Sequence, residues 1–230
     1  MGMVQRTLGP GDLRLVEVTN SSNTAGGTTT TFPADMPPSR QVGDLVVMLV
    51  SAYNMILLLP SGWTNIQTST SGARQRLHAV YKVLTAADVA NATQTVGMSG
   101  TMDSTAVTML LFRGQHATTP INASQQGGST VNTQNHATPT LTTTATAVVG
   151  KALRIRAAST YVAAGVNNYS WPLGETEVSE YIAVTAGDAT LADISVSVVP
   201  VTFVGLQGTV NATSAISRNY GSLTIVINPA

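Results

Sequence analysis

The chain has 230 residues, of which only 10% are charged, whereas a typical globular domain carries roughly 25%. Its formal net charge is zero, which argues against the basic surface that nucleic-acid binding requires. It has no cysteine, and this excludes a disulfide framework, a thiolate zinc site and a cysteine nucleophile. Thr and Ser number 34 and 19, and together with abundant Val and Gly they favour strands over helices.

Seven segments have the alternating or continuous β-branched pattern of strands, and turn residues separate them. They are 13–18, 44–52, 76–84, 106–112, 152–157, 194–204 and 223–227. The run 44–52 (DLVVMLVSA) is almost entirely apolar, which is typical of a strand covered on both faces. The pattern predicts an all-β protein, an antiparallel β-sandwich of jelly-roll-like form with long loops rich in Thr, Ser and Asn.

A single stretch, 85–92, is helix-like. Thr85 can cap its first turn, and Asp88 at the third helical position can return the hydrogen bond in a capping box. The most apolar window, 45–59, is too short and too polar to cross a bilayer, and the first residues lack the apolar stretch of a signal peptide. We therefore expect synthesis in a cytoplasm and no insertion into a membrane.

The domain organisation follows from where strand patterns are absent. Residues 1–38 are expected to form an N-terminal arm with one short strand, and residues 39–230 a single sandwich domain. The low-complexity stretch 123–135 predicts an exposed loop. A division of the domain into two half-sandwiches near residue 137 is the alternative.

Three motifs follow one another between Val42 and Ala87: VGDLVVMLVSAY, LLLPSGWTNIQTS and RQRLHAVYKVLTAAD. Gly43 permits a tight turn into the first strand, where Asp44 can accept turn amides, and the indole of Trp63 can cover an end of the sandwich. The motif residues are Gly43, Asp44, Pro60, Gly62, Trp63 and Tyr81. In this order the segment resembles a family of small β-sandwich modules in the virion proteins of tailed bacteriophages, from heads and from tails.

This resemblance implies a structural component of a virion, made in the host cytoplasm, with other virion proteins as partners. We expect a non-enzymatic capsid decoration, or cement, protein that binds across capsid subunits. Its segments 1–13 or 20–38 and the loop 123–135 would lie over a neighbour. The alternative is a receptor-binding module of a tail or head fibre that recognises a host-surface glycan. Assembly into a homo-oligomer stays open.

The glycan alternative has a candidate site in three aromatic residues, Tyr161, Tyr169 and Trp171, which surround an Asn–Asn turn. Exposed aromatic rings could stack against the face of a sugar. The competing interpretation is that Trp171 covers an end of the sandwich, as Trp63 does in the motif.

The polar candidates point to no reaction. Glu175, Glu177 and Glu180 are the one carboxylate cluster, and they could bind Ca²⁺ or serve as the acid pair of a glycoside-active enzyme. A solvated loop is favoured, because no calcium-loop motif accompanies them. The three histidines are interpreted as structural or solvated, on the polar face of a strand for His78 and in polar loops for the other two, His116 and His136. We predict no catalytic, cofactor or metal site.

Overall fold

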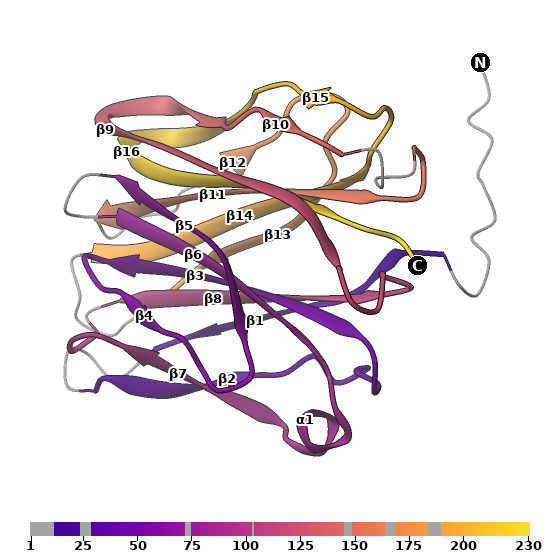
Figure 1. Ribbon diagram of the computed structural model, residues 1–230. Helices are drawn as coiled ribbons and strands as arrows, with labels where there is room; N and C mark the ends of the chain where they lie inside the picture. Colours follow the sequence, from indigo (N-terminus) through magenta and orange to yellow (C-terminus); the bar gives the residue numbers. More distant parts are fainter. Residues whose placement is uncertain are drawn as a thin grey trace.

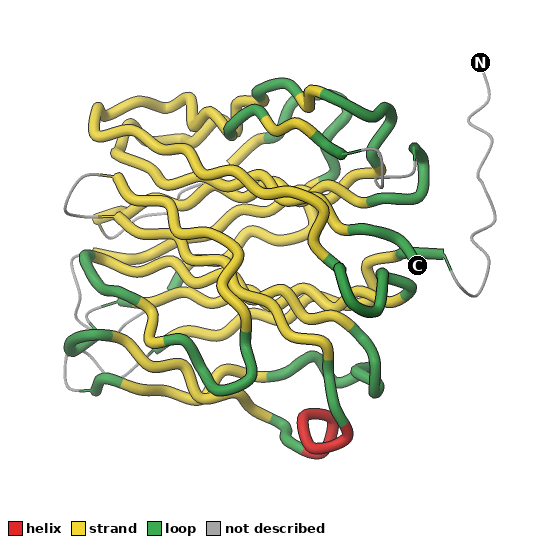
Figure 2. Tube along the Cα trace, viewed as in Figure 1, coloured by secondary structure: helices red, strands yellow, loops and turns green. Residues whose placement is uncertain are grey.

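The computed structural model describes residues 12–23, 29–71, 75–102, 104–144, 149–163, 169–183 and 190–230. Most of them lie in antiparallel strands that pack in layers, as Figures 1 and 2 show. The predicted all-β class and the packing of antiparallel sheets are thus confirmed. The elements are β1 (Arg14–Ser22), β2 (Thr31–Asp35), β3 (Leu45–Tyr53), β4 (Leu57–Leu58), β5 (Thr64–Ser71), β6 (Gln75–Val83), α1 (Ala86–Ala90), β7 (Thr93–Met98), β8 (Thr105–Arg113), β9 (Ile121–Thr138), β10 (Leu141–Thr142), β11 (Leu153–Ala163), β12 (Tyr169–Ser170), β13 (Glu177–Ile182), β14 (Thr190–Pro200), β15 (Leu206–Gln207) and β16 (Val210–Ile227).

Three sheets are stacked one on another. The central sheet has the strand order β1-β8-β3-β6-β5. Below it in Figure 1 lies the small sheet, β2-β7-β4. Above it lies the large sheet, in which β16, β11, β14 and β13 are successive neighbours and both β9 and β12 pair with β16. The short pair of β10 and β15 lies over the outer face of the large sheet.

Strand β3 is buried on both faces, as its continuous apolar sequence predicts. Leu45 and Leu49 point into the main core, between the central and large sheets. The alternate residues Val46, Met48 and Val50 point into a second core, which the small sheet covers. Strand β8 alternates between the same two cores. Because successive side chains of a strand point to opposite faces, two such strands require a layer on each side.

The N-terminal residues belong to these layers. β1 pairs with β8 at the edge of the central sheet, and β2 pairs with β7 in the small sheet. Three side chains in and after β2 are buried in the second core: Phe32, Ala34 and Met36. The predicted arm over 1–38 with one short strand is therefore wrong for the described part of that segment. Residues 1–11 and 24–28 lie outside the described residues.

Among the described strands, the chain changes between the central and large sheets once, between β8 and β9. The strands up to Arg113 build the central and small sheets, and the strands from Ile121 build the large sheet and the β10–β15 pair. Successive strands of a jelly roll instead alternate between its two sheets. The alternative prediction was a division into two half-sandwiches near residue 137. Residue 137 lies inside β9, and the chain changes sheets earlier, between β8 and β9.

Strands β9 and β16 form a long antiparallel ribbon that bends back over the large sheet (Figure 1). Ala137 pairs with Asn211 in this ribbon. Its carbonyl nevertheless accepts the hydroxyl of Ser222, far along β16, at 2.8 Å. The end of the ribbon that contains Ala137 therefore lies on the outer face of the end that contains Ser222. The predicted loop over 123–135 is wrong, because these residues are strand and pair with β16, although none of their side chains is buried, as the prediction of exposure requires.

Ser69 of β5 inserts its hydroxyl into this ribbon near the bend. The hydroxyl donates to the carbonyl of Gly127 and accepts the N–H of Ser222 at 3.1 Å. It thereby bridges two residues that face each other across β9 and β16. A glycine is required beside the insertion, since a Cβ at Gly128 would lie 2.7 Å from the carbonyl oxygen of Tyr220.

The turn into β3 has the features that Gly43 and Asp44 predict: a tight turn at the glycine, and a carboxylate that accepts a turn amide. Gly43 has a φ of +89°, a conformation that glycine adopts without strain. The buried carboxylate of Asp44 accepts the N–H of Gln41 at 2.8 Å and pairs with the guanidinium of Arg113 at 2.7 Å. The ion pair ties this turn to the end of β8, the neighbour of β3.

The second motif forms a turn after β4. The N–H of Trp63 donates to the carbonyl of Pro60 at 3.1 Å, and Gly62 between them has a φ of +77°. The indole is buried in the second core, and its N–H donates to the side chain of Gln94 at 2.9 Å. Tyr81 of the third motif is half-buried against the main core. These residues act as scaffold.

Helix α1 begins with the predicted capping box. The hydroxyl of Thr85 accepts the N–H of Asp88, and the Asp88 carboxylate accepts the N–H of Thr85 at 2.9 Å. The same carboxylate pairs with Lys82 of β6 at 2.5 Å. The helix therefore confirms the prediction, although it ends at Ala90.

Gly128→Ala is expected to destabilise the protein by about 2 kcal/mol, because the added methyl group would push against backbone at the bend. Gly100→Ala is the matched control, since no atom lies within 4 Å of its Cβ position, and we expect a change below about 0.5 kcal/mol. Urea titrations of the two variants measure the difference. Equal free energies of unfolding would contradict the steric account of the bend.

Candidate functional site

A polar layer covers the outer face of the large sheet. Along β11, the side chains of Ile155 and Ala157 lie in the main core, so the alternate residues Arg154 and Arg156 point outward. They are covered by the returning half of the β9–β16 ribbon, by β15 and by the segment 169–176. Charged and hydroxyl side chains are therefore enclosed between two layers of this protein.

Arg154, Arg156 and Glu175 form a buried ion cluster. One carboxylate oxygen of Glu175 lies 2.5 Å from Nη2 of Arg154 and 3.2 Å from Nε of Arg156. The other oxygen accepts the hydroxyl of Ser197 at 2.7 Å. The side chains of Arg156 and Glu175 are 1% and 3% exposed. The predicted solvated loop is therefore wrong at Glu175, because two guanidinium groups draw this carboxylate into the layer.

Arg156 also holds the covering layer in place. Its Nη1 donates to the hydroxyl of Thr138 and its Nη2 to the carbonyl of Gly208, each at 2.6 Å. Burial, together with the charge of Arg154, lowers the pKa of Arg156 to about 10, so the side chain stays charged at neutral pH. The buried guanidinium of Arg156 needs these partners, and its hydrogen bonds therefore hold the last residue of β9 and the segment that leads into β16.

Glu175→Gln leaves two buried guanidinium groups without their anion. We expect a loss of about 3 kcal/mol in the free energy of unfolding, because a buried charge without a partner is strongly destabilising. Glu177→Gln is the control, since Glu177 is exposed, pairs with no cation among the described residues and accepts the hydroxyl of Ser195. Urea titrations at neutral pH compare the variants. If both lost the same stability, the ion cluster would not be the cause.

His136 lies inside the bent ribbon and is fully buried. Its ring stacks on Tyr220 with centroids 4.5 Å apart and meets Tyr169 edge-on at 5.4 Å. Its Nδ1 lies 3.1 Å from the hydroxyl of Tyr169, and its Nε2 lies 3.0 Å from the carbonyl oxygen of Thr133. The predicted position of His136 in a polar loop is wrong, because residues 133–138 are strand and the ribbon folds over them.

The His136 cluster continues to a carboxylate. The hydroxyl of Tyr169 lies 3.4 Å from Asp193, whose carboxylate accepts the N–H of Thr160 at 2.6 Å. His136 and Asp193 are completely buried, and Tyr169 is 6% exposed. A His–Tyr–Asp chain that is closed to solvent cannot receive a substrate. It stabilises the bend of the ribbon.

Stability is expected to fall as the pH decreases from about 6.5 to about 4. Burial lowers the pKa of His136 from 6.5 to about 4, so the unfolded chain takes up a proton before the folded protein does. Across this window the protein should lose up to about 3 kcal/mol, with no further loss from His136 at lower pH. His136→Phe keeps a ring on Tyr220 and should show a smaller loss in urea titrations between pH 7 and 4. Identical pH profiles would contradict the assignment.

The other two histidines have different surroundings. His78 was expected on a polar face, but it is 3% exposed, since the small sheet covers that face of β6. Its ring nitrogens lie 3.1 Å from the hydroxyl of Thr68 and 3.2 Å from the carbonyl oxygen of Met55, and burial lowers its pKa. His116 is exposed after β8, where its Nδ1 accepts the N–H of Thr119 at 3.1 Å. Within the described ranges, no three His, Asp or Glu residues are grouped to hold a metal ion.

The three aromatic residues do not share one exposed surface. Tyr169 is buried, and its hydroxyl belongs to the His136 cluster. Trp171 is half-buried, with its indole N–H donating to the hydroxyl of Ser195 at 2.8 Å. Tyr161 stacks on Tyr53 of the central sheet, with ring centroids 4.3 Å apart. The expected glycan platform of three exposed rings is therefore not formed.

Glu177 and Glu180 lie on the exposed side of β13. Glu177 accepts the hydroxyl of Ser195 at 2.9 Å, and Glu180 accepts the N–H of Tyr169 at 2.8 Å. Burial raises the pKa of Glu180 above its ordinary value, and the charge of Glu177 adds to the rise. The three predicted acids are thus divided, with Glu175 enclosed by arginines and the other two near the surface.

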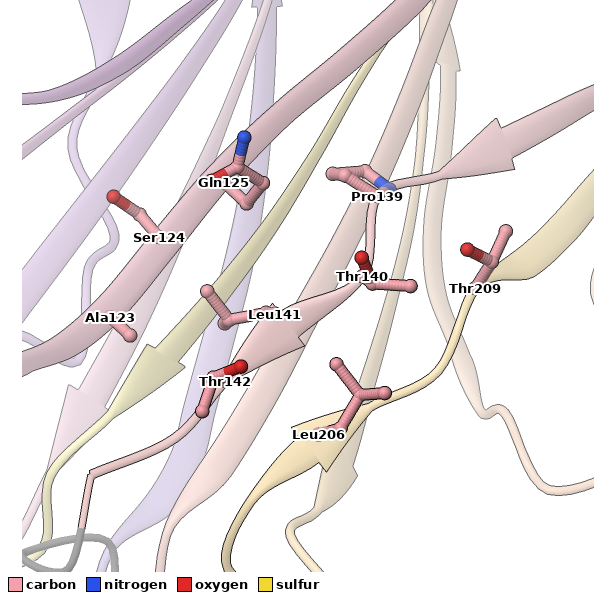
Figure 3. A pocket seen from close by; sticks show the side chains of 9 residues that line it. All are labelled: Ala123, Ser124, Gln125, Pro139, Thr140, Leu141, Thr142, Leu206 and Thr209. Atoms are coloured by element: carbon pink, nitrogen blue, oxygen red, sulfur yellow. The ribbon is translucent and has the colours of Figure 1, made fainter.

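A groove of about 710 Å³ opens over the large sheet between β9 and the β10–β15 pair (Figure 3). Its lining residues are Ala123, Ser124, Gln125, Pro139, Thr140, Leu141, Thr142, Leu206 and Thr209. Near one end, the side-chain amide of Asn122 donates to the hydroxyl of Thr144 at 2.7 Å. Near the other, the hydroxyl of Thr224 donates to the carbonyl of Pro139 at 2.8 Å. Arg156 supports both walls, because its two partners directly precede Pro139 and Thr209.

The groove offers hydrogen bonds and apolar surface without charge. Hydroxyl and amide groups come from Ser, Thr and Gln residues, and apolar surface comes from Leu206, which is 60% exposed. Phe203 and Val204, which precede Leu206 by three and two residues, are also exposed. None of the described lining residues is an acid or a base, so the groove is suited to binding an uncharged segment. A charged ligand would lose hydration there without gaining a partner.

Comparison with known proteins adds no relative: neither a protein-family model, nor a curated protein, nor a solved structure matches this chain. The resemblance to phage virion modules therefore stays a prediction from the motif residues. In the described part of the chain, no helix has the length and apolar character of a membrane span.

Proposed function

We propose that the protein is a non-enzymatic structural protein on the outside of a bacteriophage particle, a decoration protein that binds across capsid subunits. The groove between β9 and the β10–β15 pair is the observation that carries this proposal. An extended segment of a capsid subunit would place its main-chain amides against the side chains of Ser124, Gln125 and Thr142. The walls are held by buried side chains, so little ordering is required when the segment binds.

Exposed apolar residues beside the groove support the same proposal. Phe203, Val204 and Leu206 are 48%, 45% and 60% exposed. Large exposed apolar patches mark protein–protein contact sites, and these three residues lie within four successive positions of the chain. A capsid surface that covered them would add burial of apolar area to the hydrogen bonds of the groove.

This contact surface differs from the one that the sequence predicted. Of the expected flexible segments, 123–135 is strand β9, and the described residues of 20–38 pack in the central and small sheets. The groove therefore takes the role that the sequence assigned to flexible arms.

Each of the two other hypotheses loses one of its candidate residues. Tyr169 is buried and cannot stack on a sugar of a host glycan. Glu175 is held by two arginines and is not free to act as an acid in glycoside cleavage. Binding to capsid subunits depends on neither group.

Immunogold electron microscopy of purified source particles, with an antibody against this chain, tests the proposal. Gold over the whole head is the expected result. Gold confined to the tail or its fibres, or no labelling, would overturn the assignment to the capsid.

Single substitutions test the groove itself. Leu206→Asp and Thr142→Asp each place a charge on its lining, and each should weaken binding to particles that lack the protein by at least tenfold, because the charge loses hydration on binding. Val42→Asp is the control: Val42 is 64% exposed in the turn before β3, and this variant should bind normally. Cosedimentation with the particles measures binding. Full binding by both groove variants would exclude the groove as the contact.

A further inference from the structure

Side chains close the side of the sandwich where β1 and β13 face each other. β1 is an edge of the central sheet, and β13 is an edge of the large sheet. The hydroxyl of Ser179 donates to Oδ1 of Asn20 at 3.1 Å, and the hydroxyl of Tyr181 donates to Ser22 at 3.0 Å. These two bonds hold one half of the facing edges together.

In the other half, both edges carry a β-bulge. The register of β1 against β8 shifts between Leu15 and Glu17, and the register of β13 against β14 shifts between Glu177 and Ser179. Bulges bend the strands that contain them and are common beside binding sites. A hollow of about 230 Å³ opens here, and it is lined by Leu13, Arg14, Leu15, Gly150, Lys151, Leu153, Val178, Val198 and Pro200.

The hollow combines an apolar floor with basic residues. Its five Leu and Val residues all belong to the main core or pack against it. Leu15, Leu153 and Val178 are only partly buried, so the core is open to solvent at this point. Arg14 and Lys151 also line the hollow, none of the lining residues is acidic, and neither basic residue forms an ion pair with another described residue.

We propose that this hollow binds an aliphatic carboxylate, with the tail on the apolar floor and the carboxylate beside Arg14 and Lys151. Methylene groups would cover the open part of the core, and the single negative charge would complement two cations that pair with no acidic residue in the described part of the chain. At about 30 Å³ per water-sized group, the hollow holds roughly eight such groups, enough for the hydrocarbon part of an eight-carbon acid.

Two sources share this chemistry: a free fatty acid, and the carboxyl terminus of a chain that ends in a large aliphatic residue. The site is distinct from the groove of Figure 3, because the two share no lining residue. A contact with capsid subunits through the groove is therefore not needed for this proposal.

Isothermal titration of the intact chain with octanoate tests it. We expect saturable binding, at least tenfold weaker binding of the uncharged octanol, and about tenfold weaker binding of hexanoate, which lacks two methylene groups. Acetyl-Gly-Leu with a free carboxylate, compared with its amide, tests the second source. Tighter binding of octanoate supports a free acid as the ligand, and tighter binding of the peptide carboxylate supports a chain terminus.

Variants locate the binding. Arg14→Met combined with Lys151→Met removes both charges and should weaken octanoate binding at least tenfold. Val178→Phe should fill the hollow and abolish binding. Arg218→Met, at a basic residue of β16 outside the lining, should leave the affinity unchanged.

Melting temperatures establish that each variant is folded. If Val178→Phe does not fold, the test of the binding site rests on the variant that combines Arg14→Met with Lys151→Met. Two results would overturn the proposal. One is no binding of either octanoate or the peptide carboxylate at millimolar concentration. The other is octanoate binding that the double Met variant leaves unchanged.

Discussion

The burial of β3 and β8 on both faces is the constraint on which the layered structure depends. A strand turns alternate side chains to opposite faces, so a sheet with two such strands at its centre must be covered twice. The large sheet covers one face and the small sheet the other. The segment around Phe32 and the turn at Trp63 are therefore held in the second core. The small sheet also encloses His78, which its own strand pattern places on a polar face.

The next layer is built differently, because polar groups fill most of it. Where the β9–β16 ribbon returns over the large sheet, its partners are the side chains of Arg156, Ser222 and Thr224. Hydroxyl groups are small and can both donate and accept, so they can replace backbone partners where the ribbon bends. Ser69 does this between Gly127 and Ser222. The abundance of Thr and Ser thus has a structural use inside the molecule as well as on its surface.

The sequence predicts those features whose causes are local. The continuous apolar run of β3 predicts a strand covered twice, and the spacing of Thr85 and Asp88 predicts the helix cap. Strand β9 could not be predicted, because its polar sequence has no apolar alternation and its order comes from pairing with β16. The burial of His136 depends on Tyr169 and Tyr220, which are distant in sequence. The groove was missed for the same reason: its walls come from stretches of low complexity that only the folded ribbon brings together.

The positions of the charged side chains in the fold determine the chemistry of the proposed contact surface. Among the described residues, four ion pairs occupy seven charged side chains, and none of these is more than 25% exposed. Arg156 illustrates the consequence, since it holds both walls of the groove through Thr138 and Gly208, pairs with Glu175 and does not itself line the groove. The proposed recognition in the groove would then depend on shape and hydrogen bonds, which salt screens little. The hollow between β1 and β13 is the opposite case, with cations beside open apolar surface. The two proposed sites would therefore take ligands of different chemistry, one neutral and one anionic.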